Sequence, residues 1–456
     1  MIMDSLKQYT DLFKDNRKLL EDNSSEFLNR FRDAAFDMLE KSQLPSKGSE
    51  NYETTDLNDL LAPDFGVNLA RVNINVNPSN VFKCGVPQVS TSLFMMLNDI
   101  YQESPDAEKN LQKGVFIGNL NKFGKQYPEI AARYYGSIAD ITNPLTALNT
   151  LLAQDGIVVY VAKDVKMEKP VQIINLFDSG VPLMAIRRLL VILEDGAKAQ
   201  ILSCDHTQRE NMKFLSLQTT EIFVGKGASL DFYELEESTR DTTRLSTIYM
   251  ALEKDCEATA DAITLYNGNT RNEYYASFNG EGASLNLCGM GILDETRHLD
   301  TFSRVIHNIP RCHTSELFKY VLDDKAVGAF TGLVKVAQGA DHTEAYQSNR
   351  NIISSDDAYM YSKPQLEIYD DDVKCSHGCA TGQIDEQQVF YMQTRGIPRN
   401  TALFLLKQAF MADVIDAISL PGLRERLHLL VEKRFSGEPL GCFSCSAGCI
   451  TENSNQ

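Results

Sequence analysis

The hydrophobic pattern divides the chain into helical ends and a central block of short strands. Near the start, Leu6, Tyr9 and Leu12 recur at helical spacing, as part of a pattern that predicts helix over residues 5–42. The central block consists of short runs rich in β-branched or aromatic residues, a composition typical of strands. These runs cover residues 156–161, 171–176, 189–193, 220–224 and 230–233. No long helical pattern interrupts the block until about residue 385.

A glycine turn recurs inside the central block. A Gly-Ala step followed by alternating polar and apolar residues stands at Gly196, Gly227, Gly282 and Gly339, at spacings of 31, 55 and 57 residues. A degenerate copy at Glu253–Ala260 divides the middle gap. A period of about 28 residues with tight turns favours a coiled β-solenoid. A sandwich of long meandering strands is the alternative, because the copies are imperfect.

Helical patterns return toward the C-terminus, over residues 385–392, 400–418 and 423–435. Three helices are too few to bury a large core, so we expect them to pack on the β block or on a partner. The predicted fold is mainly β with helical ends. Its parts are an N-terminal helical or mixed region over 1–150, a solenoid core over 151–372, a C-terminal helical domain over 373–440 and a Cys-rich flexible tail over 441–456.

The charge balance excludes several classes of partner. The 456 residues include 44 basic and 62 acidic side chains, for a net charge of −18. Such a surface repels phosphate backbones and anionic membranes, so we expect neither nucleic acid nor membrane as a partner. No run of 18 apolar residues is present, and the N-terminus lacks the apolar core of a signal peptide. These features predict a cytoplasmic protein.

Cys375, His377 and Cys379 place two thiols and an imidazole within five residues. In an extended segment, residues at i, i+2 and i+4 point to the same side, so all three can face one ligand. This donor set suits an iron or zinc ion or a sulfur-containing intermediate, and it leaves a coordination position open. The alternative is structural: His377 bonds a backbone group while the thiols pack.

Three further thiols, Cys442, Cys445 and Cys449, form a second cluster close to the C-terminus. The C-x2-C-x3-C spacing resembles half of an iron–sulfur binding loop, although a flexible tail also binds metal adventitiously. It supports an alternative function, a stand-alone iron–sulfur or metal-binding protein.

Other polar clusters carry weaker signals. The acidic run at residues 370–372 suggests an alternative, a calcium-dependent solenoid enzyme that acts on carbohydrate. Two carboxylates on one strand face are, however, more typical of a solvated edge. We expect the single histidines His298, His307 and His313 to be structural. The chain has no Gly-x4-Gly-Lys-Ser/Thr loop and no Gly-x-Gly-x2-Gly after a strand. Any ATP chemistry must therefore come from another subunit.

Two segments resemble the signature of the SufB/SufD family, whose members are scaffold subunits of the SUF iron–sulfur cluster assembly machinery. They are residues 364–378 (PQLEIYDDDVKCSHG) and 387–397 (QQVFYMQTRGI), and the resemblance extends over about residues 145–420. SufB-like members carry a cysteine near the position of Asn349 and usually lack Cys-Ser-His-Gly. Asn349 together with the pair Cys375 and His377 therefore favours the SufD branch.

The resemblance implies a right-handed parallel β-helix, a non-enzymatic scaffold role and two partners. One is a SufB-like paralogue that pairs through the β-helices, and the other is the ATPase SufC, which docks on the C-terminal helices. His377 matches the histidine of the SufB–SufD interface, where a transient iron–sulfur cluster forms. Cys375 matches the cysteine before it, whereas Cys379 stands where many members have alanine. Flavin in the complex and a homodimer of the isolated chain remain open.

Overall fold

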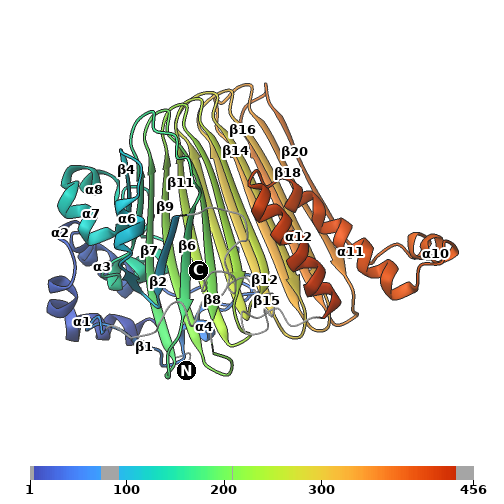
Figure 1. Ribbon diagram of the computed structural model, residues 1–456, viewed down its shortest axis with the longest axis horizontal. Coiled ribbons are helices and arrows are strands. Elements are labelled where there is room, and N and C mark those ends of the chain that lie inside the picture. Colours follow the sequence, from blue (N-terminus) through green and yellow to red (C-terminus); the bar gives the residue numbers. More distant parts are fainter. Residues whose placement is uncertain (1–4, 73–91, 208, 438–456) are drawn as a thin grey trace, which may run out of the picture.

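Two parallel β-sheets dominate the computed structural model, which describes residues 5–72, 92–207 and 209–437 (Figure 1). The first sheet contains β1 (Gly66–Val67), β4 (Val115–Asn119), β5 (Ile157–Val161), β7 (Leu183–Leu193), β9 (Phe214–Val224), β11 (Thr242–Leu252), β13 (Asn269–Phe278), β15 (His298–His307), β17 (Val327–Val336) and β19 (Tyr359–Ile368). The second contains β2 (Ser92–Leu97), β3 (Ile100–Gln102), β6 (Val171–Phe177), β8 (Lys198–Thr207), β10 (Ser229–Glu237), β12 (Glu257–Tyr266), β14 (Ser284–Leu293), β16 (His313–Leu322), β18 (Glu344–Ile353) and β20 (Lys374–Gly382).

From β5 onward the chain changes sheet after every strand. The first sheet runs β19-β17-β15-β13-β11-β9-β7-β5-β4 with β1 paired to β7, and the second runs β20-β18-β16-β14-β12-β10-β8-β6-β2-β3. From β5 to β20, neighbours within a sheet are parallel and lie one coil apart in the chain. This topology is a flattened β-solenoid in which each coil adds one strand to each sheet. The predicted solenoid core is confirmed, and the sandwich alternative is wrong.

Left-handed turns allow the coils to stack closely. The predicted turn glycines Gly196, Gly227, Gly282 and Gly339 have φ values of 67°, 61°, 73° and 84°. The N–H of Gly196 donates to the carbonyl of Lys226 in the next turn at 2.7 Å. In the degenerate copy Asp255 has a φ of 55° and donates in the same way to Glu281 at 2.9 Å. Aspartate tolerates this conformation, so the repeat continues where glycine is missing.

The strands extend beyond the apolar runs that predicted them. The run over residues 189–193 is only the second half of β7, whose first half contains Arg187 and Arg188. Both arginines are buried, and Arg188 pairs with Glu221 at 2.8 Å. A prediction from apolar runs ends the strand where charged residues begin. Charged residues that pair with one another can nevertheless lie inside a sheet.

The N-terminal region closes one end of the solenoid and covers the outer face of the first sheet. Its helices are α1 (Lys7–Asp22), α2 (Glu26–Asn29), α3 (Arg32–Lys41), α4 (Leu57–Leu61), α6 (Pro105–Lys109), α7 (Leu120–Gln126), α8 (Pro128–Tyr134) and α9 (Pro144–Leu152). The single helix predicted over residues 5–42 is therefore three helices. Every residue of α9 after its first proline is buried, and Asn143 caps its N-terminus by accepting two backbone N–H groups. The antiparallel pairs β2–β3 and β4–β5 finish the two sheets at this end.

The C-terminal region adds a last strand before its helices. β20 is followed by α10 (Glu386–Thr394), α11 (Arg399–Asp416) and α12 (Pro421–Ser436), so the part predicted from residue 373 begins with solenoid. Pro421 is the first residue of α12, where its fixed φ suits a helix start. α11 and α12 pack on the outer face of the second sheet, whereas α10 projects from the body (Figure 1). In the described ranges no helix is long and apolar enough to cross a membrane.

Candidate functional site

β20 places the three predicted site residues on one side of the last strand of the second sheet. Cys375, His377 and Cys379 pair in register with Ala345, Gln347 and Asn349 of β18. Those β18 residues are buried and lie on the inner face of the solenoid. Because register preserves the face, the two thiols and the imidazole also lie on the inner face, at the C-terminal end of the stack. The segment is therefore an extended strand.

This end of the solenoid leaves both sheets with an unpaired edge. Among the strands that the structure describes, β19 pairs only with β17, and β20 only with β18. Lys374 donates its N–H to Thr343 on the paired side of β20 at 2.8 Å. Since N–H direction alternates along a strand, the amides of His377 and Thr381 point to the free side. In β19 the same alternation places Pro364, which has no N–H, on the free side, where no ladder bond is lost.

The three side chains have different surroundings. The Cys375 thiol is half-buried against the solenoid core, and this burial raises its pKa. The Cys379 Sγ lies 3.0 Å from the Ser362 Oγ of β19, and Ser362 in turn donates to Asn349 Oδ1 at 2.7 Å. His377 is exposed. Among the residues that the structure describes, no group of three or more His, Cys, Asp or Glu is arranged to hold a metal ion.

Polar side chains that the sequence analysis missed lie behind His377. Gln347 donates from Nε2 to Glu316 Oε2 at 2.9 Å, and Ser303 Oγ donates to the same oxygen at 2.9 Å. Glu316 and Gln347 are only 2% and 3% exposed. Burial without a cationic partner raises the pKa of Glu316 to about 7. Only the strand register connects these residues with His377, so composition and motif spacing do not identify them.

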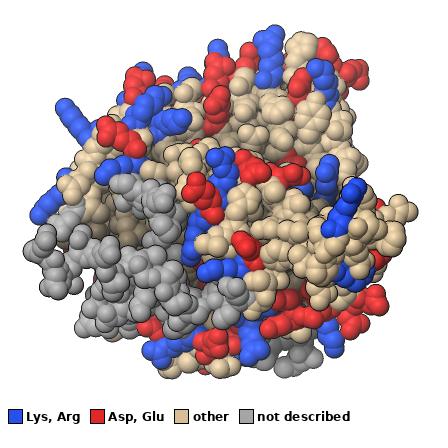
Figure 2. Space-filling view, turned by 45° about the vertical axis from the view of Figure 1, so that its right-hand side comes forward, with Lys and Arg blue, Asp and Glu red and all other residues tan. Residues whose placement is uncertain are grey.

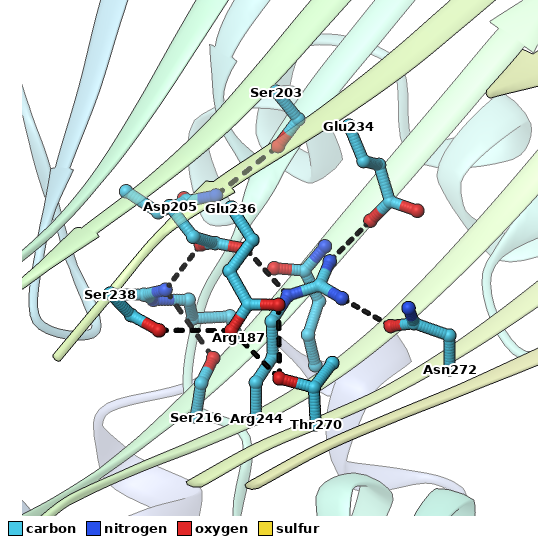
Figure 3. A network of polar contacts seen from close by, with 12 residues as sticks. Arg187, Ser203, Asp205, Ser216, Glu234, Glu236, Ser238, Arg244, Thr270 and Asn272 are labelled. Atoms are coloured by element: carbon cyan, nitrogen blue, oxygen red, sulfur yellow. Dashed lines mark hydrogen bonds and ion pairs between the residues drawn. The ribbon is translucent and has the colours of Figure 1, made fainter. Parts of the chain in front are cut away.

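A larger ionic network lies inside the solenoid toward its N-terminal end (Figure 3). Arg244 of β11 donates to Asp205 Oδ2 at 2.7 Å and to Glu234 Oε1 at 2.5 Å. Arg187 of β7 donates to the other oxygen of Asp205 at 3.0 Å. Nearby Glu236 accepts from Thr270 at 2.9 Å, and burial raises its pKa to about 7.

Packed side chains separate this network from the open end. A Cβ at Gly289 would lie 2.7 Å from the ring of Phe318, and one at Gly291 would lie 2.6 Å from Leu299. The glycines therefore make room for neighbouring side chains instead of leaving a passage. We interpret the ionic network as part of the folded core. Buried pairs of this kind are costly to break, by about 3–5 kcal/mol when one partner is removed.

The remaining candidate residues either have structural roles in turns and hydrogen bonds or lie outside the described residues. Asp370 accepts the N–H of Gly339 at 2.9 Å, and Asp372 lies 3.1 Å from the ring of His342, so these acids belong to turns. His298 and His307 bond Thr54 and Thr314, as expected of structural histidines. In the part of the chain that the structure describes, the buried thiols are Cys204, Cys256, Cys288 and Cys312. The second cluster, Cys442, Cys445 and Cys449, lies outside the described residues.

Exposed aromatic residues mark the projecting helix. Phe390 and Tyr391 of α10 are 68% and 60% exposed, and Val389 is the residue of this helix that is buried. Figure 2, turned so that this side comes forward, shows positive and negative side chains interspersed, with wider uncharged areas at the right of the view. An exposed aromatic pair on a projecting helix is typical of a protein-binding surface.

Together, the fold and the site define a class: a two-sheet β-solenoid, capped at one end, whose open end carries thiols and an imidazole on its inner face. Comparison with known proteins specifies the family. Residues 3–173 match the SufBD protein N-terminal region, and residues 176–410 match the SufBD core domain of SUF system FeS cluster assembly. The chain belongs to the SufB/SufD family of iron–sulfur cluster assembly proteins.

Curated relatives agree with this assignment. An iron–sulfur cluster assembly SufBD family protein of Synechocystis is 28% identical over 411 residues, which cover 88% of this chain and 90% of that protein. The iron–sulfur cluster assembly protein SufD of Escherichia coli is 30% identical over 245 residues, covering 54% of this chain and 58% of that protein. SufD of Bacillus subtilis is 24% identical over 329 residues, covering 71% and 74%. The resemblance predicted from the motifs is confirmed.

Proposed function

We propose that this chain is a non-enzymatic scaffold subunit on which iron–sulfur clusters form, within a complex that contains a SufB-type paralogue and a SufC-type ATPase. The observation that carries the proposal is the open solenoid end. Two unpaired sheet edges and the inner-face residues Cys375, His377 and Cys379 meet there. The family match supports the cluster-assembly role, and the incomplete donor set supports a site shared with a partner.

Pairing with a paralogue follows from the two free edges. A second solenoid placed end to end extends both sheets at once, with main-chain hydrogen bonds supplying affinity. Large side chains at this end add apolar area to such a contact: Tyr359 is 55% exposed and Tyr369 is 59% exposed. Unpaired edges are otherwise a liability that invites aggregation, so a dedicated partner is the expected solution. A second copy of this chain is the competing occupant.

His377 is the proposed iron ligand of the assembling cluster. Its imidazole is exposed at the shared end, and a neutral ring nitrogen is a good ligand for iron. Cys375 is the proposed second ligand. Because burial raises the pKa of this thiol, it holds its proton until a metal displaces it. Iron and sulfide are here the cargo, and the remaining ligands come from the partner or from the incoming sulfur.

The C-terminal helices are the proposed docking site for the ATPase. α11 and α12 are fixed to the second sheet, while α10 presents Phe390 and Tyr391 away from it. A force applied to these helices reaches the solenoid through their packing on the outer face. In the proposed cycle, ATP binding brings two ATPase copies together, strains the helices and opens the solenoid interface to iron and sulfur.

Substitution of the histidine tests this function. His377→Ala is expected to assemble with both partners and to lose maturation of client iron–sulfur proteins, measured by complementation of a strain that lacks the native subunit. His342→Asn is the matched control, because it removes an exposed imidazole near the same end and asparagine tolerates the φ of 57° found there. Client maturation at the wild-type level in His377→Ala would remove the ligand role.

A further inference from the structure

The inner face behind His377 contains a layer of polar side chains that no sequence motif indicates. Glu316 of β16 pairs in register with Gln347 of β18, and Gln347 pairs in register with His377 of β20. The three residues thus occupy the same position in three consecutive coils. The layer runs from the buried Glu316 to the exposed His377 at the open end. Neighbouring strands lie about 4.8 Å apart, which is within reach of a hydrogen bond between long side chains.

The opposite sheet leaves room for the amide of Gln347. Gly332 of β17 lies across the solenoid, and a Cβ on it would be 2.3 Å from Gln347 Nε2. Any larger residue at this position would displace the amide. Gly332 pairs in register with Ser303 on one side, the residue that donates to Glu316. The first sheet therefore contributes both the room for the Gln347 amide, at Gly332, and the Ser303 hydroxyl that bonds Glu316 of the second sheet.

Two acceptors of the layer are left without a partner. Gln347 donates inward from Nε2 to Glu316, but Gln347 Oε1 is buried and has no hydrogen bond within the described part of the chain. Glu316 Oε1 is in the same state. Such groups are rare in native structures, because each unmet bond costs about 1–3 kcal/mol. The side chain in the next position outward, His377, carries a ring N–H that can satisfy Gln347 Oε1.

We propose that Gln347, anchored by Glu316 and Ser303, is a positioning residue that accepts a hydrogen bond from one ring nitrogen of His377 and so presents the other nitrogen at the open end. Only the functional consequence of this hydrogen bond, the presentation of a ring nitrogen to iron, rests on the proposed ligand role of His377. When one ring nitrogen keeps its proton, the lone pair of the other nitrogen points outward. In metal-binding histidines, a hydrogen bond from the second ring nitrogen fixes the tautomer in the same way. The hydrogen bond itself is a property of the metal-free chain.

The tautomer of His377 tests the proposal. The full-length chain, labelled with ¹⁵N-histidine and free of metal, is studied by NMR at a pH where the ring is neutral, and the His377 signals are assigned by their loss in His377→Ala. The wild-type ring is expected to show one dominant tautomer. Gln347→Leu is expected to shift the tautomer ratio, and Glu316→Gln, which frees the amide to turn over, is expected to shift it less.

A substitution two inner-face positions further along β18 provides the control. Asn351→Leu removes the bonds of Asn351 to Asn349 and Thr381 on the same inner face without touching Gln347. It should leave the His377 tautomer unchanged. Identical His377 signals in wild type, Gln347→Leu and Glu316→Gln would overturn the proposal, and Glu316→Gln keeps the test decisive if Gln347→Leu does not fold. Because no cluster is involved, this outcome is independent of the complementation result for His377→Ala.

Discussion

Asp261 is a buried carboxyl under the C-terminal helices. It stands on the outer face of β12, in register with Tyr233 and Cys288, which belong to the apolar cluster beneath α11 and α12. Its Oδ1 has no hydrogen-bond partner in the described part of the chain, and burial raises its pKa to about 8. The folded chain therefore holds this proton where the unfolded chain has lost it. We therefore expect the stability of the fold around Asp261 to depend on pH.

The consequence of Asp261 for stability has a definite sign. Between the unfolded pKa, about 3.9, and the folded pKa, the native state binds more protons than the unfolded state. This carboxyl therefore lowers the free energy of unfolding by up to about 1.4 kcal/mol for each pH unit gained in that window. Asp261→Asn stays neutral and should lose stability less steeply up to a pH of about 8. Thermal midpoints measured over this range check the prediction.

Asp371→Asn is the control for Asp261→Asn, because Asp371 is an exposed carboxyl near the open end. It should follow the wild-type pH profile. Parallel profiles of wild type and Asp261→Asn would show that the Asp261 carboxyl is ionised in the folded chain and would contradict the prediction.

The sequence alone identified the candidate ligand residues but not the polar residues that lie behind them. Cys375, His377 and Cys379 were predictable, because their spacing is short and an extended backbone brings them to one face. Glu316 and Gln347 were not, because they belong to earlier coils and only the register of β16, β18 and β20 aligns them with His377. A single glutamate within a strand gives no signal of that kind in a linear sequence.

At the element scale, β20 determines whether the open end can pair. The amide of Thr381 points to the free side of the strand, so proline at this position removes an outward N–H without losing a bond to β18. Thr381→Pro is expected to leave the isolated chain folded and to reduce its association with a SufB-type partner by at least tenfold. Affinity measured with purified proteins checks the effect.

Thr381→Val is the matched variant. Both substitutions remove the hydroxyl that accepts from Asn351 Nδ2 at 3.0 Å, but valine keeps the backbone N–H. Thr381→Val should bind the partner nearly as well as wild type. Equal affinities of the proline and valine variants would mean that the free edge of β20 makes no main-chain bonds to the partner.

Element prediction succeeded where the apolar pattern was complete and failed where charges are buried. The turns at Gly196 and Gly227 were visible as a repeat, and Asp255 preserves it through its left-handed backbone. The first half of β7 was missed because Arg187 and Arg188 find partners inside the fold. Their pairing depends on Asp205 and other strands, which no local window contains.

At the scale of the whole molecule, the two ends of the solenoid differ. Helices and antiparallel strands close the N-terminal end, whereas within the described ranges the outer edges of β19 and β20 pair with no further strand (Figure 1). Stacked repeats are usually capped at both ends, and the partner proposed above would cover the end formed by β19 and β20. The net charge of −18 disfavours anionic partners but not a protein that supplies β-strand edges.

Hydrogen–deuterium exchange of the end strands tests whether the open end pairs with a partner. The measurement compares the monomeric chain with its complex with a SufB-type partner, over residues 359–368 and 374–382. We expect fast exchange of the His377, Cys379 and Thr381 amides in the monomer and strong protection of both strands in the complex. A complex that forms while these amides exchange as fast as in the monomer would contradict pairing through the open end.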